Sequence, residues 1–512
     1  MNAFFSLLLI FFCLLTAPFV STVTAKDTWT SIRSKNYLVI GNASEGDLRT
    51  TAVQLERFRD VFIKQFKGAA LNSPVPTTVI VFKSDSSFGP YKPMFKGRRA
   101  DIAAYFQPGF DMNYISLTTE RRQFNPYELI FHESVHLLVD NRVRTSPVWF
   151  NEGLAEYFST LEFPPEKSVG GKAVMFGKPI LRHILNLRRN KLLPLETLFG
   201  VDRDSSHYNE REKSSMFYAQ SWALIHHLIH GQGGKRQPQL VRFLELLATG
   251  TPLAQSFQKA FESDYAVLEK ELREYVRQDK YQALVLPYRE SADSDVELKG
   301  VQITEAQALA YLGDLLLHHE RGDEAENHLL RALALEPDLS MANASLGLLC
   351  ANRRDFAAAK EHLRRAIKSD PQNYLAQYYY AYALSSERMD DQQMVSRYGP
   401  EEAAQMQTAL KKVIEISPDF PESYRLLAFV YLMTNTRLDE AETLLQRALA
   451  LSPGRHEFSY VLAQVYLRRQ DYKAARVTLQ QIMASGPDAQ MRALVLDMLE
   501  TVALREKYQP KR

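Results

Sequence analysis

The residues best suited to chemistry in this chain of 512 residues form one pentapeptide, His132-Glu133-Ser134-Val135-His136. Two histidines four positions apart lie one turn apart on the same face of an α-helix, where both imidazoles can bind one metal ion. The glutamate between them can handle a proton. The pattern H-E-x-x-H therefore predicts the site of a zinc-dependent hydrolase.

A rigid helix must hold these histidines, and the surrounding sequence predicts one over residues 126–140. Asn125 can cap this helix, Pro126 suits the first helical position, and Glu128 stands three residues after the cap, as in a capping box. Apolar residues before and after the motif supply core contacts: Leu129, Ile130, Leu137 and Leu138. The two imidazoles are therefore expected to project from a helix anchored in a core.

A catalytic zinc ion normally takes three protein ligands and keeps its fourth position for water or substrate, so a third ligand must come from elsewhere. After a turn at Pro147, residues 148–157 predict a second helix. Glu152 and Glu156 share one face of it, because they are four positions apart. This helix is expected to complete the site.

The H-E-x-x-H motif followed by Asn-Glu-Gly-Leu-Ala-Glu-Tyr at residues 151–157 resembles the gluzincin metallopeptidases, the group that contains thermolysin and the zinc aminopeptidases. The resemblance implies that His132, His136 and Glu152 bind one Zn²⁺ per chain. It also implies that Glu133 is the general base.

The same resemblance gives Glu156 a supporting role, in which its carboxylate hydrogen-bonds a ligand histidine and fixes the orientation of the ring. Asn151, next to the third ligand, is expected to support the site as well. The alternative for Glu156 is an ordinary solvated helix glutamate or an i,i+4 neighbour on the helix.

Gluzincins often add a tyrosine or histidine that donates a hydrogen bond to the oxyanion. Tyr218 is the best candidate, since its segment resembles the tyrosine-bearing helix that follows the zinc motifs in the aminopeptidases. The alternative is a core position, because Tyr218, Trp222 and Ile225 recur at helical spacing. His207 and Tyr208 are lesser candidates for the same role.

With zinc bound, the pKa of its water falls towards neutrality, and Glu133 can take the proton as the oxygen attacks a polarised carbonyl. Glu133 then returns the proton to the departing amine. Other amide and ester hydrolases can use the same groups, so the peptide substrate is implied by the family resemblance alone.

A second group of histidines, His226, His227 and His230, is not expected to bind metal. No acidic residue stands at a useful spacing along the chain, and Gly231 ends the helix there. Capping of the helix end or packing at the surface is the expected role.

The segment before the zinc helix predicts a small mixed sheet. Strands are expected at residues 37–40, 77–82, 102–106 and 113–117, with a helix over residues 48–66. In gluzincins the edge strand of the sheet can pair with extended substrate, and Tyr114 to Leu117 is the candidate for that edge. Plain sheet structure is the alternative.

The first 25 residues have the pattern of a signal peptide, with an almost wholly apolar run over residues 4–15 and small residues at 23–25. The chain is therefore expected to be exported, and periplasmic or secreted. Because no Lys or Arg precedes the apolar run, an uncleaved N-terminal anchor is the alternative. Loss of Cys13 with the leader leaves Cys350 alone, so no internal disulfide is expected.

The composition of the whole chain is that of a soluble globular protein, with 46% hydrophobic residues and a formal net charge of +2. That near balance argues against a nucleic-acid partner. Beyond the leader, no run is long enough to span a membrane.

From about Ile303 the chain repeats itself with a period close to 34 residues. Six positions of the first copy recur 34 residues later, as Leu346-Gly347, Ala359, Leu363, Ala366 and Pro371. The pattern resembles the tetratricopeptide repeat (TPR), which stacks helical hairpins into a solenoid. About five copies are expected, and the third carries about 13 extra residues.

The expected organisation is a signal peptide (1–25), a gluzincin-like α+β zinc peptidase domain (26–285), a linker (286–300), an all-α TPR solenoid (301–495) and a C-terminal helix end with a polar tail (496–512). The predicted function is an exported zinc metallopeptidase whose TPR groove binds its peptide or protein substrate or partner proteins. The alternative is a catalytically inactive, peptidase-like TPR scaffold for protein interactions in the cell envelope.

Overall fold

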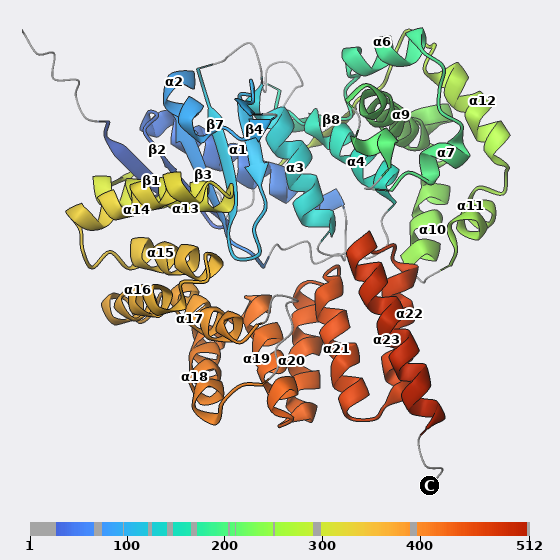
Figure 1. The fold of residues 1–512 in the computed structure, drawn as a ribbon. Helices are drawn as coiled ribbons and strands as arrows, with labels where there is room; N and C mark the ends of the chain where they lie inside the picture. The colour runs from blue at the N-terminus through green and yellow to red at the C-terminus, as the bar shows by residue number, and fades with distance from the viewer. Residues whose placement is uncertain are drawn as a thin grey trace, which may run out of the picture.

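A computed structural model of the chain describes residues 27–65, 74–95, 97–120, 125–140, 147–164, 172–202, 205–209, 211–248, 251–289, 298–389 and 397–508. The expected leader at residues 1–25 lies outside these ranges, as do residues 390–396 of the insertion expected in the third repeat. Figure 1 shows an N-terminal region of mixed α and β structure and a C-terminal stack of helices.

Among the described residues, six strands form the main sheet, in the order β10-β1-β2-β3-β7-β6. The three central strands β2, β3 and β7 run parallel, while β1, β10 and β6 pair antiparallel to their neighbours. The strands of this sheet are β1 (Trp29–Arg33), β2 (Tyr37–Gly41), β3 (Thr77–Phe82), β6 (Ala104–Gln107), β7 (Asn113–Thr118) and β10 (Val301–Ile303). Two short ribbons pair β4 (Met94–Phe95) with β5 (Arg98–Arg99), and β8 (Ala173–Phe176) with β9 (Leu284–Pro287).

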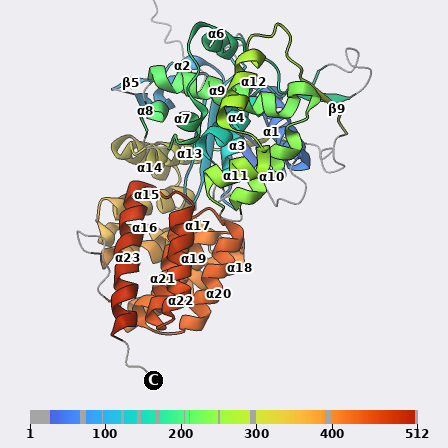
Figure 2. The same cartoon turned by 90° about the vertical axis from the view of Figure 1, so that its right-hand side faces the viewer.

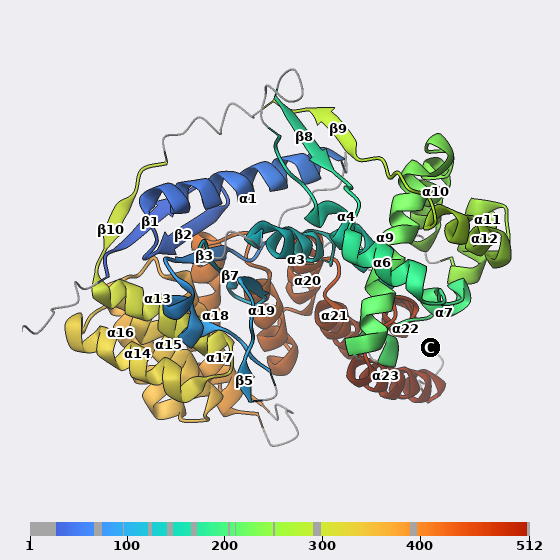
Figure 3. The ribbon, with the colours of Figure 1, turned by 90° about the horizontal axis from the view of Figure 1, so that it is seen from above.

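The strand Thr77–Phe82 explains why both faces of this sheet must be covered. All six of its residues are buried, and successive side chains point to opposite faces. Val79 and Val81 join the core shared with helices α1 (Glu45–Gln65) and α3 (Pro126–Asp140). Ile80 and Phe82 join a second cluster that contains Leu312 and Leu315 of helix α13 (Glu305–His318). The first helix of the repeats therefore covers the other face of the sheet, as Figure 3 shows.

The remaining helices of the N-terminal region follow α3 along the chain and pack around α4 and α9. They are α4 (Val148–Ser159), α6 (Leu181–Arg189), α7 (Leu195–Phe199), α8 (Ser206–Asn209), α9 (Arg211–His230), α10 (Gln237–Ala248), α11 (Leu253–Phe261) and α12 (Tyr265–Tyr275). Short helical turns lie at α2 (Asp85–Phe88), η1 (Gly89–Tyr91) and η2 (Gly231–Gly233). Helix α4 lies between α3 and α9 and packs against both.

The described part of the repeat region consists of eleven helices: α13, α14 (Gly322–Leu335), α15 (Ser340–Asn352), α16 (Phe356–Ser369), α17 (Tyr374–Glu387), α18 (Pro400–Ile416), α19 (Pro421–Thr434), α20 (Leu438–Leu451), α21 (His456–Arg468), α22 (Tyr472–Ala484) and α23 (Ala489–Lys507). Each odd-numbered helix from α13 to α21 packs against the helix that follows it. Figure 2 shows the resulting stack beneath the N-terminal region.

The recurring glycines of the repeat pattern lie where paired helices approach closely. A Cβ atom on Gly313 would lie 2.7 Å from Leu329, and one on Gly347 would lie 2.4 Å from Leu363. The glycines recur every 34 residues because the two helices of each hairpin make the same close contact. The solenoid predicted from that period is confirmed, and the third hairpin carries its insertion between α17 and α18.

The structure also corrects the predicted sheet. The strand that contains Tyr114 to Leu117 lies between β3 and β6, so it is internal, and the prediction of an edge there is wrong. The edge strand on this side of the sheet is β6, which pairs antiparallel with β7. Residues 301–303, expected at the start of the repeats, form β10 and pair with β1. Among the described residues, no helix has the length and apolar character needed to span a membrane.

Candidate metal centre

Two adjacent helices bring the predicted ligands together. Helix α3 covers residues 126–140 as its capping signals predict, and the Asn125 side chain accepts a hydrogen bond from the backbone N–H of Tyr127 at 3.0 Å. It presents His132 and His136 from successive turns, while Glu152 comes from the packed helix α4. A buried, helix-borne site is the rigid mount that metal binding requires.

A glycine sets the depth at which α4 lies. A Cβ atom on Gly153 would lie 2.4 Å from the carbonyl oxygen of Ser221 and 2.7 Å from Ile225, both on α9. Only glycine therefore fits at this crossing. The glycine of the Asn-Glu-Gly segment therefore allows the close contact between α4 and α9, one residue after Glu152.

The three ligand atoms form a nearly equilateral triangle. The Nε2 atoms of His132 and His136 are 3.1 Å apart, and Oε2 of Glu152 lies 3.3 Å from the first and 3.4 Å from the second. Zinc bonds of about 2.0–2.1 Å in a tetrahedron separate neighbouring ligand atoms by roughly 3.3 Å. Within the described part of the chain, this is the one group of three such side chains close enough to hold a metal ion.

The carboxylate of Glu152 has one satisfied oxygen and one that faces the imidazoles. Its Oε1 accepts a hydrogen bond from the Tyr208 hydroxyl at 3.0 Å. Its Oε2 is buried and, among the described residues, accepts no well-formed hydrogen bond. Since a buried charge needs compensation, a cation shared with the two imidazoles fits this oxygen. The donor set therefore fits zinc.

The electrostatics of the site favour an anionic Glu152. Burial raises the pKa of this carboxyl group, but the neighbouring imidazoles of His132 and His136 outweigh burial and lower the pKa to about 2. Burial lowers the pKa of His132, and contacts with Glu152 and Glu156 reverse this and raise it. The pKa of Glu133 is raised, chiefly by burial.

Glu156 joins a ligand histidine to the next helix. Its Oε1 lies 3.8 Å from Nδ1 of His132, and its Oε2 lies 3.1 Å from Nε2 of His183 and 3.2 Å from Arg182 on α6. Glu156 is therefore buried and paired, so the solvated alternative is wrong. Sequence reasoning missed His183 and Arg182, because neither stands at a recognisable spacing from the zinc motifs.

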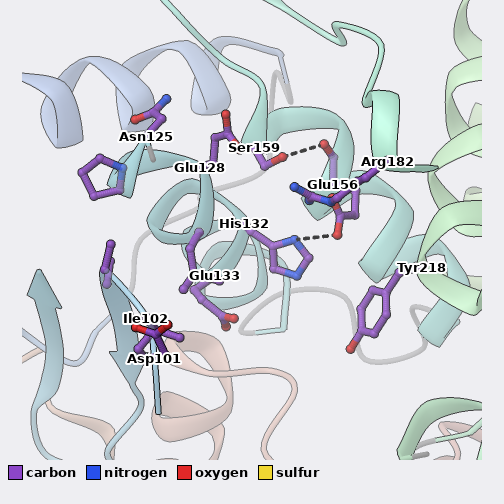
Figure 4. A pocket seen from close by; sticks show the side chains of 14 residues that line it. Asp101, Ile102, Asn125, Glu128, His132, Glu133, Glu156, Ser159, Arg182 and Tyr218 are labelled. Carbon is purple, nitrogen blue, oxygen red and sulfur yellow. Dashed lines mark hydrogen bonds and ion pairs between the residues drawn. The ribbon is translucent and has the colours of Figure 1, made fainter. Parts of the chain in front are cut away.

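A cleft of about 600 Å³ opens at this site. The segment Asp101–Ala104, which leads into β6, lines this cleft together with Glu133, Glu156 and Tyr218. Figure 4 shows Asp101 and Ile102 on the same side as Glu133, with Tyr218 on the far side of His132. A substrate in this cleft would lie directly beside the ligand histidine.

Tyr218 lines the cleft, and its ring centre lies 6.3 Å from that of His132. Burial, followed by the charge of Glu152, raises the pKa of its hydroxyl, which keeps the proton available for donation. Tyr208 is 6.2 Å from Tyr218 by ring centres and holds Glu152. Asn151 is buried beside Glu152, and its supporting role stays a prediction.

The surface packing predicted for the second histidine group is wrong for His226 and His227. His226 and His227 are buried, and His230 contacts the hydroxyl of Tyr157 at 2.8 Å. Helix α12 supplies Glu271, whose carboxylate lies 3.2 Å from His227. The acidic partner comes from a distant segment, so spacing along the chain could not indicate it.

Comparisons with known proteins match separate parts of the chain. Residues 128–254, which include the metal centre, match a family described as a protein of unknown function (DUF1570). Residues 345–391 and 432–496 match models of the tetratricopeptide repeat. No curated protein matches the chain.

Several solved structures resemble part of the chain. A thermophilic TPR protein of Thermus thermophilus is 20% identical, covers 39% of this chain and 99% of its own, and has a TM-score of 0.31. The pilF protein of Pseudomonas aeruginosa is 18% identical, with 40% and 92% covered and a TM-score of 0.32. YrrB, a TPR protein with an unusual peptide-binding site, is 17% identical, with 38% and 92% covered and a TM-score of 0.31.

The family models and the helical hairpins agree on the C-terminal region. It is a TPR-like solenoid, and it follows an N-terminal region of mixed α and β structure. Stacks of this kind present extended surfaces to proteins and peptides, so the repeats indicate a role in protein–protein interaction.

Proposed function

We propose that the chain is an exported, zinc-dependent peptide hydrolase with a gluzincin-like N-terminal domain, and that its repeats bind substrate or partner proteins. The observation that carries this proposal is the triangle of His132 Nε2, His136 Nε2 and Glu152 Oε2, with sides of 3.1, 3.3 and 3.4 Å. Zinc bound there would supply Lewis acidity, which polarises a carbonyl group and lowers the pKa of water.

The chain's own residues would then move the proton and bind the developing charge. Glu133 lines the cleft between the two ligand histidines, where its carboxylate can accept a proton from water and pass it to the departing amine. The Tyr218 hydroxyl, which keeps its proton, can donate a hydrogen bond to the oxyanion. Glu156 would hold the ring of His132 in the orientation that binding requires.

The central experiment compares the wild-type protein with Glu133→Gln. The variant keeps the three ligands, so both proteins should contain one zinc ion per chain by elemental analysis. Digestion of a peptide library should fall by roughly 10²–10⁴-fold in the variant, the usual contribution of a general base. Equal cleavage by the two proteins, or a wild type that takes up no zinc, would refute the proposal.

The second candidate is a protein-interaction scaffold in which this site does not turn over substrate. The comparisons support it more directly than hydrolysis, because the matched models describe repeats and a family of unknown function. Against inactivity stands the presence of all four residues that the reaction needs, His132, Glu133, His136 and Glu152. A wild type that binds zinc, cleaves nothing and still captures partner proteins would favour the scaffold.

Export is part of the proposal and has its own test. The apolar run at residues 4–15 is the supporting observation. Cleavage of the leader predicts a mature protein that begins near residue 26, which N-terminal sequencing of the protein recovered from the cell envelope or medium can measure. An intact N-terminus in the membrane fraction would instead support the anchored alternative.

A further inference from the structure

The turn between β6 and β7, residues 108–112, is held by helices α13 and α17 of the solenoid. Asp111 at this turn is fully buried. Its Oδ1 lies 2.9 Å from Nε2 of His318 on α13, and its Oδ2 accepts a hydrogen bond from the hydroxyl of Tyr379 on α17. Its Oδ1 also accepts a hydrogen bond from the backbone N–H of Met112 at 2.8 Å. The carboxylate therefore has partners on all sides.

A second carboxylate strengthens the same contact. Asp314 on α13 accepts hydrogen bonds from Ser345 on α15 at 2.6 Å and from the Tyr114 hydroxyl on β7. The Phe110 ring lies 6.2 Å from that of Tyr378 on α17. Helices α13 and α17 thus hold a turn of the chain itself, and α15 braces α13 through Ser345, on the surface that such stacks offer to peptides.

The opposite end of the same hairpin is a wall of the cleft. Residues 101–104 line it and lead into β6, which pairs with β7 alone because it is the edge of the sheet. The turn leads directly into β7, which runs from the side of the repeats into the sheet (Figure 1). The position of the wall therefore depends on β7, on the packing of α3, and on the anchored turn.

We infer that Asp111 is a positioning residue: by anchoring the β6–β7 turn in the face formed by α13, α15 and α17, it holds residues 101–104 against the cleft. This inference rests on the proposed hydrolysis. It makes the repeats part of the site, since the turn that α13 and α17 hold sets the wall along which a substrate lies. Asp111 touches neither metal ligand nor cleft, so it acts through the hairpin.

The test uses the full-length protein with two variants and one control. Asp111→Asn keeps the shape of the side chain and removes its charge, and Tyr379→Phe removes a single hydroxyl in case the first variant folds poorly. Asp338→Asn makes the same chemical change at an exposed position in the turn between α14 and α15, and serves as the matched control. Each protein is examined for zinc content, hydrogen exchange and peptide hydrolysis.

Both variants should keep one zinc ion per chain. Amide exchange over residues 101–107 should rise about tenfold, the effect of losing one charge-assisted hydrogen bond, while α3 is unchanged. The value of kcat/KM should fall by about the same factor, mainly through KM, because the wall contacts substrate and not the reacting water. The control should match the wild type.

If amide hydrogen exchange in the two variants rises only over residues 108–113 and peptide hydrolysis is unchanged, the inference is overturned. Faster exchange throughout α3, with loss of zinc in both variants, would overturn it too, because Asp111 would then support the whole fold. If the wild type cleaves no peptide, the proposed function is refuted. Amide exchange at residues 101–107 in the variants then still tests whether Asp111 positions this segment.

Discussion

Replacement of Gly153 by alanine tests the link between helix packing and the metal centre. The added Cβ would lie 2.4 Å from the Ser221 carbonyl oxygen, whereas ordinary contacts begin near 3.4 Å. Because that neighbour is backbone in a buried helix, α4 must move by about 1 Å. Overpacking of this kind costs about 1–3 kcal/mol.

The same movement displaces Glu152, which adjoins Gly153 on α4. Because α4 lies between α9 and α3, this movement would change the distances from Oε2 to the two imidazoles, now 3.3 and 3.4 Å, so that they no longer match a tetrahedral ion. We expect zinc affinity to fall by roughly 10–100-fold, as when a supporting contact is lost. The melting temperature should fall by roughly 2–8 °C.

Gly46→Ala is the matched control for this substitution. Gly46 is exposed on helix α1, and a Cβ there meets nothing nearer than Ser44 at 3.7 Å. Replacement of Gly46 by alanine should leave the free energy of unfolding unchanged or raise it by up to about 1 kcal/mol. Thermal denaturation and competition with a zinc chelator measure both effects. A Gly153→Ala protein that matches the control in melting temperature and zinc affinity would refute the reasoning.

Two further predictions concern buried ionisable groups. Burial opposes the charged form of His318, but Asp314 and Asp111 outweigh it and raise its pKa from 6.5 to about 10; Tyr114 and Tyr379 complete its surroundings. Because the folded pKa is the higher one, this stabilisation is complete below about pH 6.5 and is lost as the pH rises towards 10. The free energy of unfolding, measured by urea denaturation, should therefore fall in the wild type as the pH rises over that range. In His318→Gln the fall should be smaller by a few kcal/mol, and equal falls in the wild type and the variant would contradict the assignment. Glu156→Gln keeps the shape of the side chain but loses the charge beside His132, so zinc affinity should drop roughly 10–100-fold while the fold is kept. Isothermal titration with zinc measures the drop, and unchanged affinity would remove the supporting role.

Much of the local structure could be predicted because its signals are short-ranged. The helix at residues 126–140 begins at its capping residues, and β3 covers residues 77–82 as the apolar run indicates. The period of 34 residues marked the solenoid, since each copy must bury the same contacts. Residues 173–176 and 301–303 were missed as strands, because such short segments carry little periodicity of their own.

The candidate site was predictable only to the extent that its residues lie in one motif. His132 and His136 share a helix face by spacing alone, whereas Glu152 was assigned from a family resemblance. His183 and Tyr208, which contact Glu156 and Glu152, come from helices that the motif does not reach. Their contacts depend on how α6 and α8 pack, which the local sequence does not record.

The amino-acid sequence by itself determined the helix that presents two imidazoles and the repeats that stack into a solenoid, because helical periodicity is a property of neighbouring residues. Tertiary structure alone decided that Glu152 approaches those imidazoles to 3.3 and 3.4 Å, and that α13 covers the open face of the sheet. It also decided that Asp111 meets His318, more than two hundred positions away. Such contacts arise from the burial of complementary surfaces between distant segments, and no spacing along the chain encodes them.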